Sequence, residues 1–427
     1  MSKNTRREFL IATAGVGVCS VAGVGLGQSR SPNEKLNLGF IGLGGRGNQN
    51  LGEMEGENVV ALCDVDALHL AKAAEKYPKA RQYRDFRKMI DEAKDLDAVV
   101  ISTPHHIHAP ATARALRAGK HVYCEKPLTH TVWEARVITE LAAKHKVATQ
   151  HGTNAHTFCD MRRAVELVQG GAIGPVREAH VWCDESYGGA TRPTERPPVP
   201  AHLDWDLWLG PSPERPYHKA YHPYGWHYFS DFGEGTVGNM GPHLQDLPFW
   251  ALKLRHPLSV EAEGPPVDPE SPPKWLIVRY EYGARGDLPP VKLTWYHGGK
   301  RPTFPEGINP QLWAQGILFV GEKGQLAADY HKLRLLPRSE FADFPFPKPF
   351  TPASNAHHAE WIRACKTGAP TSCPFEYAGP LAEAVQLGLV AHRVGRRIEW
   401  DAANLKARNC PEADRFIRTE YRKGWEL

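Results

Sequence analysis

Length, composition and charge narrow the class of protein before any motif is considered. At 427 residues the chain is too long for one ordinary domain of about 150 residues, and its 41% hydrophobic and 23% charged residues exclude wholesale disorder and fibrous repeats. The 52 Lys and Arg nearly balance the 48 Asp and Glu, and the charge of +4 is too small at this length to favour a nucleic-acid or membrane-surface partner. We therefore expect a soluble enzyme of two or three domains with no nucleic-acid partner.

The chain begins with a predicted targeting segment. Residues 5–10 read Thr-Arg-Arg-Glu-Phe-Leu, a twin-arginine motif, and the uncharged apolar run from Ile11 to Leu26 follows. Its glycines make this run a poor transmembrane helix, and small residues precede a cleavage position near Gln28. We expect residues 1–28 to be a signal peptide for the twin-arginine export machinery, with a periplasmic or otherwise exported mature protein and no stable membrane anchor. An uncleaved anchor or a chance arginine pair is the alternative.

The twin-arginine route carries folded proteins, and two expectations follow from it. A nicotinamide cofactor would be bound tightly and before export, because free nucleotides are scarce outside the cytoplasm. Folding would take place in a reducing compartment, so the seven cysteines after the signal are expected to be free thiols. Their spacing matches neither a zinc motif nor a disulfide framework.

The first predicted strand, Leu36 to Leu43, leads into a glycine-rich loop and then a segment with helical character. In such a GxGxxG loop the glycines permit a tight turn and let backbone N–H groups approach a pyrophosphate. The predicted cofactor-binding residues of the loop are Gly42, Gly44, Gly45, Arg46 and Gly47.

Asp64 follows the next predicted strand and lies 22 residues after Gly42. A carboxylate at this place bonds the adenosine ribose diol and repels a 2′-phosphate. The loop and Asp64 together predict NAD(H) rather than NADP. A residue of the turn that ends the strand is the other interpretation of Asp64.

Strand and helix patterns then alternate as far as residue 153. Helices are predicted at Asp66 to Lys76, Phe86 to Ala93, His108 to Ala118 and Val132 to Lys144, and strands at Leu96 to Ser102, His121 to Cys124 and Val147 to Gln150. This alternation predicts a Rossmann domain at residues 34–153, an α/β unit with a doubly wound parallel sheet and ligands at the carboxyl ends of its strands.

Two polar clusters fall at such strand ends. Thr103-Pro104 follows one strand, and Glu125-Lys126-Pro127 follows the next. His105, His106 and His108 come directly after Pro104, without an acidic or cysteine ligand nearby in the sequence. We therefore expect these imidazoles to form hydrogen bonds or to contact a cofactor, and we expect no metal.

Residues 154–427 are predicted to form one larger α+β domain. Strands are expected at Val176 to Trp182, Trp275 to Tyr282, Val291 to Tyr296, Gly316 to Val320 and Gln325 to Asp329, and helices at Phe158 to Gln169, Val237 to Leu252, His357 to Lys366 and Tyr377 to Val394. Because strands dominate its middle, we expect a large, open, mainly antiparallel sheet with the last helices packed against it. Several proline-rich stretches are expected to be stiff loops.

Aromatic and histidine side chains gather between Trp205 and Trp226. Aromatic faces stack on sugar rings while His and Tyr bond hydroxyls, which suits a carbohydrate pocket, but aromatic loops are also common packing material. The sequence favours neither interpretation. Trp226 is the substrate candidate of this segment, and Asn154 and His156, just after the last Rossmann strand, are candidates for the same pocket.

The segment Ala118 to Leu128, which contains Glu125-Lys126-Pro127, resembles the signature of the Gfo/Idh/MocA oxidoreductases. This family includes glucose–fructose oxidoreductase and inositol 2-dehydrogenase. The similarity extends to the glycine loop, Asp64, Thr103-Pro104 with His108, and the Gly-Asn-Met-Gly-Pro-His-Leu-Gln-Asp stretch at residues 238–246. It implies a bound NAD(H), an open-sheet domain over the cofactor cleft, a small carbohydrate substrate and a homo-oligomer, either dimer or tetramer. The cofactor contacts implied at the strand ends are Thr103, Pro104, His108, Glu125 and Lys126.

Lys126 is the predicted acid/base. Oxidation of a sugar alcohol requires a base for the hydroxyl proton while hydride leaves the same carbon, and a partly desolvated lysine has its pKa lowered towards the working range. Glu125 either orients Lys126 or contacts the nicotinamide ribose.

Asn239 and His243 are four residues apart, so on a helix they share one face. We expect His243 to carry a second proton or to bind a hydroxyl, and Asn239 to position the substrate. The family usually carries Asp where Asn239 stands, and an amide binds a hydroxyl but cannot accept its proton. Asp246 either binds substrate or caps a neighbouring element.

Three functions follow from these residues. The first is an exported NAD(H)-dependent oxidoreductase acting on a secondary hydroxyl of a sugar, inositol or sugar derivative. The second uses the same cofactor without net redox change, as a glycosidase or lyase that oxidises, eliminates and reduces; the export signal and Asn239 favour it. The third is a non-catalytic sugar-binding protein, since a fold alone does not guarantee chemistry.

Overall fold

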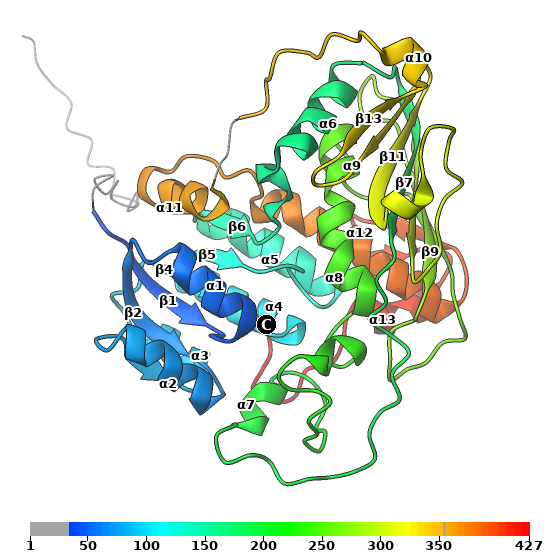
Figure 1. The fold of residues 1–427 in the computed structure, drawn as a ribbon. Coiled ribbons are helices and arrows are strands. Elements are labelled where there is room, and N and C mark those ends of the chain that lie inside the picture. The colour runs from blue at the N-terminus through cyan, green and yellow to red at the C-terminus, as the bar shows by residue number, and fades with distance from the viewer. Residues whose placement is uncertain (1–33, 353–355) are drawn as a thin grey trace, which may run out of the picture.

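The computed structural model describes residues 34–352 and 356–427, so the expected signal peptide lies outside the described residues. The described chain contains a six-stranded sheet in its N-terminal part and a nine-stranded sheet in its C-terminal part (Figure 1). No helix within these ranges is long and apolar enough to cross a membrane.

The first sheet is parallel throughout, with the strand order β3-β2-β1-β4-β5-β6. Its strands are β1 (Asn37–Ile41), β2 (Asn58–Cys63), β3 (Arg81–Tyr83), β4 (Ala98–Ile101), β5 (His121–Cys124) and β6 (Thr149–His151), and its helices are α1 (Gly45–Glu53), α2 (Ala67–Lys76), α3 (Phe86–Glu92), α4 (His105–Arg117) and α5 (Val132–His145). Every residue of β4 is buried, as expected for a parallel strand with helices on both faces. The order reverses between β1 and β4, which confirms the Rossmann prediction and places the ligand crevice at the carboxyl ends of these strands.

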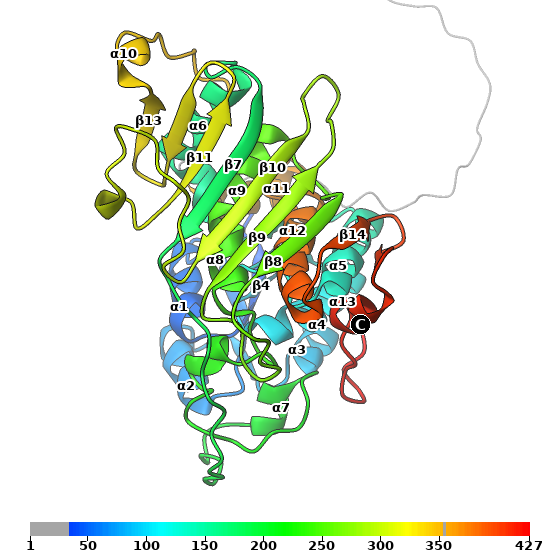
Figure 2. The same cartoon turned by 90° about the vertical axis from the view of Figure 1, so that its right-hand side faces the viewer.

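The second sheet has the order β13-β12-β11-β7-β10-β9-β8-β14-β15 and is antiparallel except for the β7–β10 pair, as predicted. Its strands are β7 (Val176–Cys183), β8 (Ser259–Glu263), β9 (Leu276–Tyr282), β10 (Val291–His297), β11 (Gln315–Gly321), β12 (Gln325–Ala328), β13 (Leu333–Leu336), β14 (Ile398–Asp401) and β15 (Lys406–Ala407). Alternate residues of β10 are buried, so one face of the sheet packs on the core. Figure 2 looks onto the other face, with α8, α9 and α12 behind the strands.

The helices of this part are α6 (Cys159–Gln169), α7 (Trp205–Leu209), α8 (Gly235–Leu244), α9 (Asp246–Leu252), α10 (Arg338–Phe341), α11 (His357–Thr367), α12 (Phe375–Val394) and α13 (Asp414–Ile417), with short 3-10 turns η1 (Asn154–Thr157), η2 (Gly225–Tyr228), η3 (Pro310–Leu312) and η4 (Pro411–Ala413). Two of them return to the first sheet: Trp361 of α11 is fully buried among residues of that sheet, and α12 packs along α5. Residue 153 therefore separates the two sheets in sequence, although helices from the second part of the chain pack against the first sheet and its helices.

Two helix predictions were wrong in their bounds. The single helix expected from Val237 to Leu252 is interrupted at Gln245, because Pro248 has no N–H to offer the carbonyl of Leu244. Helix α4 begins at His105 rather than at His108, so all three histidines after Pro104 lie in its first turn. Both changes matter for the site, because they set the directions of the side chains at the carboxyl ends of the strands.

Candidate active site

The glycine loop connects β1 to α1 and depends on the absence of side chains. Gly42 has a φ of +82°, and a Cβ atom there would lie 2.6 Å from the Ser102 carbonyl oxygen. A Cβ atom on Gly47 would lie 2.0 Å from the Gly42 carbonyl oxygen. Gly44 precedes α1 without a side-chain cap, and the space around the Cβ position of Gly45 is open to 4 Å. The N-terminus of α1 is therefore free to bind an anion with its N–H groups.

Asp64 lies directly beside this loop. Its Oδ2 accepts a hydrogen bond from the backbone N–H of Leu43 at 2.8 Å, and its Oδ1 accepts one from that of Asp66 at 2.8 Å. The carboxylate thus belongs to the turn after β2 and is held against the glycine loop at the same time, and its contact with a ribose stays a prediction.

His69 was not singled out from the sequence, because it lies in the first turn of α2 without a local motif. Its Nδ1 lies 3.6 Å from Asp64 Oδ2, and the hydrogen bond with this carboxylate raises the pKa of the imidazole. A Cβ atom on Gly44 would lie 2.6 Å from the His69 ring, so the ring borders the loop. The strand, loop, open helix end and carboxylate fit an NAD dinucleotide: N–H groups for the pyrophosphate and Asp64 for the ribose.

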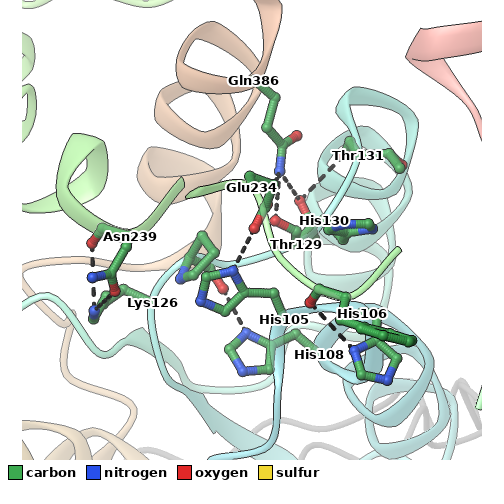
Figure 3. Close-up of polar contacts among 12 residues, drawn as sticks. His105, His106, His108, Lys126, Thr129, His130, Thr131, Glu234, Asn239 and Gln386 are labelled. Carbon is green, nitrogen blue, oxygen red and sulfur yellow. Dashed lines mark hydrogen bonds and ion pairs between the residues drawn. The ribbon is translucent and has the colours of Figure 1, made fainter. Parts of the chain in front are cut away.

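Lys126 follows β5 and meets a residue of the second part of the chain. Its Nζ donates a hydrogen bond of 2.6 Å to the side-chain Oδ1 of Asn239 on α8, and its distance to the Asn239 carbonyl oxygen is 3.4 Å (Figure 3). Burial lowers the pKa of the Lys126 ammonium, while the nearby Glu125 charge acts in the opposite direction. The peptide bond between Lys126 and Pro127 is cis. Two of the predicted catalytic residues, Lys126 and Asn239, are thus in direct contact.

Glu125 is held by the first helix of the Rossmann part. Its Oε1 accepts hydrogen bonds of 2.9 Å from Arg46 Nε and from Asn50 Nδ2. Asn50 Oδ1 in turn lies 3.0 Å from His358 Nε2 on α11. Arg46, a predicted cofactor residue, therefore fixes the carboxylate next to Lys126, and Asn50 is a supporting residue that the motif did not indicate.

His243 lies one helical turn after Asn239 on α8, as predicted. Burial lowers the pKa of its imidazole well below the usual value, and the positive charge of Lys126 acts in the same direction. The ring makes an edge contact with Tyr330, with centroids 6.4 Å apart. A neutral imidazole next to an amine suits hydroxyl binding and proton transfer.

A buried pair of titratable groups lies next to Lys126 and was missed from the sequence. His105 Nδ1 contacts Glu234 Oε2, and Gln386 Nε2 lies 3.3 Å from Glu234 Oε1 (Figure 3). Burial raises the pKa of Glu234 well above its usual value and lowers that of His105 well below, so the neutral forms of both are favoured. Glu234 stands before the glycine-rich start of α8, where no local pattern marks a carboxylate as functional.

The other residues at this strand end are mainly tied to the backbone. His108 places its Nδ1 2.6 Å from the Pro127 carbonyl and its Nε2 2.8 Å from the Thr103 carbonyl, so both ring nitrogens face protein oxygens. Pro104 precedes α4 as its N-cap residue. The Thr103 hydroxyl is buried without a hydrogen-bond partner among the described residues. His108 links the two strand ends that the sequence assigned to the cofactor, and its cofactor contact stays a prediction.

The four substrate candidates separate into two groups. Trp226 stacks on His227 with centroids 3.6 Å apart and meets the His105 ring at 4.5 Å, so it borders the site. His156 and Asp246 are fully or almost fully buried and contact each other at 2.9 Å, and the Oδ1 atom of Asn154 is buried. His156 and Asp246 thus form a buried polar pair, Asn154 is only partly buried, and a substrate contact of these three residues stays a prediction.

Most of the aromatic segment serves as packing. Trp205 and Trp208 stack with centroids 4.6 Å apart, and Tyr221 meets Phe229 edge-on at 4.7 Å. The segment also docks on the Rossmann part, because His222 Nε2 lies 3.0 Å from Asp66 Oδ2. The aromatic segment therefore packs between the second part of the chain and the turn after β2.

Comparison with known proteins agrees with this geometry. Residues 36–153 match the model of the Gfo/Idh/MocA oxidoreductase family for the NAD-binding Rossmann fold, and residues 180–289 match the model for its C-terminal alpha/beta domain. The chain belongs to the Gfo/Idh/MocA family of NAD-dependent oxidoreductases.

The curated relatives of this Gfo/Idh/MocA chain include two kinds of enzyme. A glycosyl hydrolase family 109 protein of Solibacter usitatus is 31% identical over 208 residues, which are 40% of this chain and 46% of the relative. Inositol 2-dehydrogenase of Salmonella typhimurium is 30% identical over 169 residues, 38% of this chain and 49% of the relative. The chain spans about half the length of the curated relatives it matches.

Solved structures show the same fold at low sequence identity. The WlbA dehydrogenase from Bordetella pertussis, in complex with NADH and UDP-GlcNAcA, gives a TM-score of 0.61 at 16% identity over 86% of this chain and 99% of its own. GenD2 from gentamicin A biosynthesis, in complex with NAD, gives 0.58 at 18% identity over 88% and 99%.

Proposed function

We propose that the protein is an exported NAD(H)-dependent oxidoreductase that acts on a secondary hydroxyl of a sugar, inositol or sugar derivative. The observation that carries the proposal is the 2.6 Å contact of Lys126 Nζ with Asn239 Oδ1 at the carboxyl end of β5. This edge of the sheet is also where the glycine loop leaves β1. A desolvated amine thus lies at the ligand crevice of a nucleotide-binding fold.

The residues divide the proton chemistry among them. When bound, NAD⁺ supplies the hydride acceptor. Burial lowers the pKa of Lys126, which increases the fraction of neutral amine available to take the hydroxyl proton. Asn239 holds Nζ in place through an uncharged oxygen, and the neutral His243 offers the same hydroxyl a hydrogen-bond partner.

A second candidate is a redox-neutral glycosidase or lyase that oxidises, eliminates and reduces on a tightly bound NAD. Two observations favour it. Asn239 stands where the dehydrogenases of the family usually carry Asp, and one of the curated relatives is a glycosyl hydrolase family 109 protein. A closed redox cycle also requires no exchange of cofactor outside the cytoplasm.

One set of assays tests the proposal and separates the two candidates. The purified chain is examined for bound nucleotide, and then supplied with free sugars and with nitrophenyl glycosides, with and without added NAD. Net NADH formation from free sugars supports dehydrogenation, and release of nitrophenol without net NADH supports glycoside cleavage. Protein that carries and binds no nucleotide contradicts both candidates.

Lys126→Ala is the matching variant. We expect it to lower either activity by about 10²–10⁴-fold, since it removes the proton carrier, and to keep the bound nucleotide. Exposed Lys88 on α3 provides the control, because Lys88→Ala removes an amine outside the site. Turnover of Lys126→Ala within a few-fold of wild type contradicts the assignment.

Export and assembly belong to the same proposal. The twin-arginine motif supports export, and replacement of Arg6 and Arg7 by lysine should retain the protein in the cytoplasm in a fractionation experiment. Membership of the family supports a homo-oligomer, dimer or tetramer, which light scattering of the purified protein measures directly.

A further inference from the structure

Behind His243, three groups with metal-ligating chemistry converge in a closed part of the core. His156 of η1, Asp246 at the start of α9 and Cys373 just before α12 are buried, and one ligand atom from each lies within 4.8 Å of the other two. Among residues 34–352 and 356–427 this is the one group of His, Cys, Asp and Glu with ligand atoms so close. The reaction proposed above uses none of the three.

The hydrogen bonds of the protein leave this cluster incomplete. Asp246 Oδ1 accepts from Tyr377 at 2.7 Å and lies 3.1 Å from His156 Nε2. Asp246 Oδ2 also lies 2.9 Å from His156 Nε2, but only the Oδ1 contact has hydrogen-bond geometry, so Oδ2 has no donor among the described residues. Asp246 is fully buried, and a buried carboxylate oxygen without a donor is destabilising, which a cation at this place would offset.

Cys373 adds a soft ligand to this cluster. Its Sγ lies 3.9 Å from His151 Nδ1, and its backbone N–H donates to Gln150 Oε1 at 3.2 Å, which fixes the residue at the end of β6. A thiolate, an imidazole and a carboxylate are the donor set of zinc sites, whereas Mg²⁺ and Ca²⁺ take oxygen ligands. Ligands of a tetrahedral zinc ion are separated by roughly 3.5 Å. The separations here run from 2.9 Å between Asp246 and His156 to at most 4.8 Å, so shifts of about 1 Å bring the three ligand atoms to that spacing.

We propose that His156, Asp246 and Cys373 bind a Zn²⁺ ion, with His151 next to the sulfur as its hydrogen-bond partner. Binding displaces the thiol proton, so the thiolate and the carboxylate together neutralise the ion. The ion joins η1, which follows β6, to the start of α9 and to the segment just before α12. It is a positioning site: it fixes the helix pair that carries His243 against the Rossmann sheet, and it takes no part in hydride transfer.

The test uses the full chain purified without chelators. Zinc per chain is measured by mass spectrometry, and after removal of the metal the protein is titrated with Co²⁺. We expect about one ion per chain and a thiolate-to-cobalt charge-transfer band in the near ultraviolet. The band should vanish in Cys373→Ala. It should persist in the matched control Cys410→Ala, because Cys410 is an equally buried thiol that is not among the three proposed ligands. A wild-type protein that binds neither Zn²⁺ nor Co²⁺, or a band that survives in Cys373→Ala, overturns the proposal.

Asp246→Asn decides the matter if Cys373→Ala does not fold. The amide keeps an acceptor for Tyr377 and His156 but removes the ligand charge. The Kd for Co²⁺ should rise by about tenfold or more, since even loss of a partner outside the ligand set weakens metal sites by 10–100-fold. An unchanged Kd overturns the proposal.

Discussion

Asn239→Asp adds a negative charge next to the amine of Lys126, while the side chain at position 239 keeps its shape. In the native chain Nζ of Lys126 donates to an amide oxygen at 2.6 Å, and burial lowers the pKa of Lys126. A carboxylate in the same place favours the ammonium form, so the pKa of Lys126 rises. At an effective dielectric constant of about 20, two unit charges about 4 Å apart interact by about 4 kcal/mol, an upper limit of about 3 pKa units at 1.36 kcal/mol each. Measured opposite-charge shifts of 1–3 units give the same range.

The sign of the effect on the rate follows directly. In the proposed reaction the neutral amine is the base, so activity is present above the pKa of Lys126 and is lost as the pH falls through it. In Asn239→Asp the acidic limb of the pH profile of kcat/KM should therefore move up by about 1–3 pH units. At pH values below the pKa of Lys126, kcat/KM falls about tenfold per pH unit, and at pH values above it kcat/KM recovers.

The assay is the pH dependence of kcat/KM with the substrate found in the screen. Asn239→Leu is the matched control, because leucine has a similar size and brings no charge. Its profile should lose amplitude without the upward shift. An unmoved acidic limb in Asn239→Asp, or an equal upward shift in Asn239→Leu, would refute the assignment of Lys126 as the titrating base.

Three further substitutions test the parts of the structure that support this site. Gly47→Ala should abolish or strongly weaken NAD binding in calorimetry, because its Cβ would lie 2.0 Å from a loop carbonyl oxygen. Gly52→Ala on the same helix is the control: its Cβ has open space, so the free energy of unfolding should stay unchanged or rise by about 0.5–1 kcal/mol. Asp64→Asn keeps a hydrogen-bond acceptor but removes the charge that repels a 2′-phosphate. The ratio of NAD to NADP affinity should therefore fall at least about tenfold. An unchanged ratio would assign Asp64 to the turn alone. Trp208→Ala should lower the free energy of unfolding by about 3–5 kcal/mol in denaturant titrations, since this side chain is 3% exposed and stacks on its aromatic neighbours; a loss under 1 kcal/mol would mean that the aromatic segment is not core.

The Rossmann half was predictable because its signals are local. The strand His121–Cys124 has the bounds that were expected, since a short apolar run between Gly119 and a proline-ended turn leaves little choice. Helix α5 begins at Val132 as expected, where Thr131 accepts from the Glu134 N–H in a capping box, and it ends at His145, one residue after the expected end. Such patterns depend on neighbours in the sequence, which a single chain displays in full.

The pair of His105 and Glu234 shows what sequence could not provide. The two residues are 129 positions apart, and only the packing of α4 against the loop before α8 brings them together. His105 was expected to form hydrogen bonds, but no local pattern indicated Glu234 as its partner. Burial, which moves both pKa values, is a property of the assembled core. Residues with perturbed pKa values are functional candidates once this environment is known.

The contact between Lys126 and Asn239 makes the active site depend on how the two parts of the chain are packed. The residues are 113 positions apart, and α12 packing along α5 holds their elements together. Between these two helices, Arg136 of α5 donates two hydrogen bonds to Glu383 of α12: Nε to Oε1 at 2.8 Å and Nη2 to Oε2 at 3.0 Å. Glu383 is only 1% exposed. A displacement of about 1 Å at a catalytic group can cost about 100-fold in rate. Glu383→Gln leaves the half-buried Arg136 with a weaker partner. It should therefore lower kcat more than it lowers nucleotide affinity, because the glycine loop and Asp64 both belong to the Rossmann part.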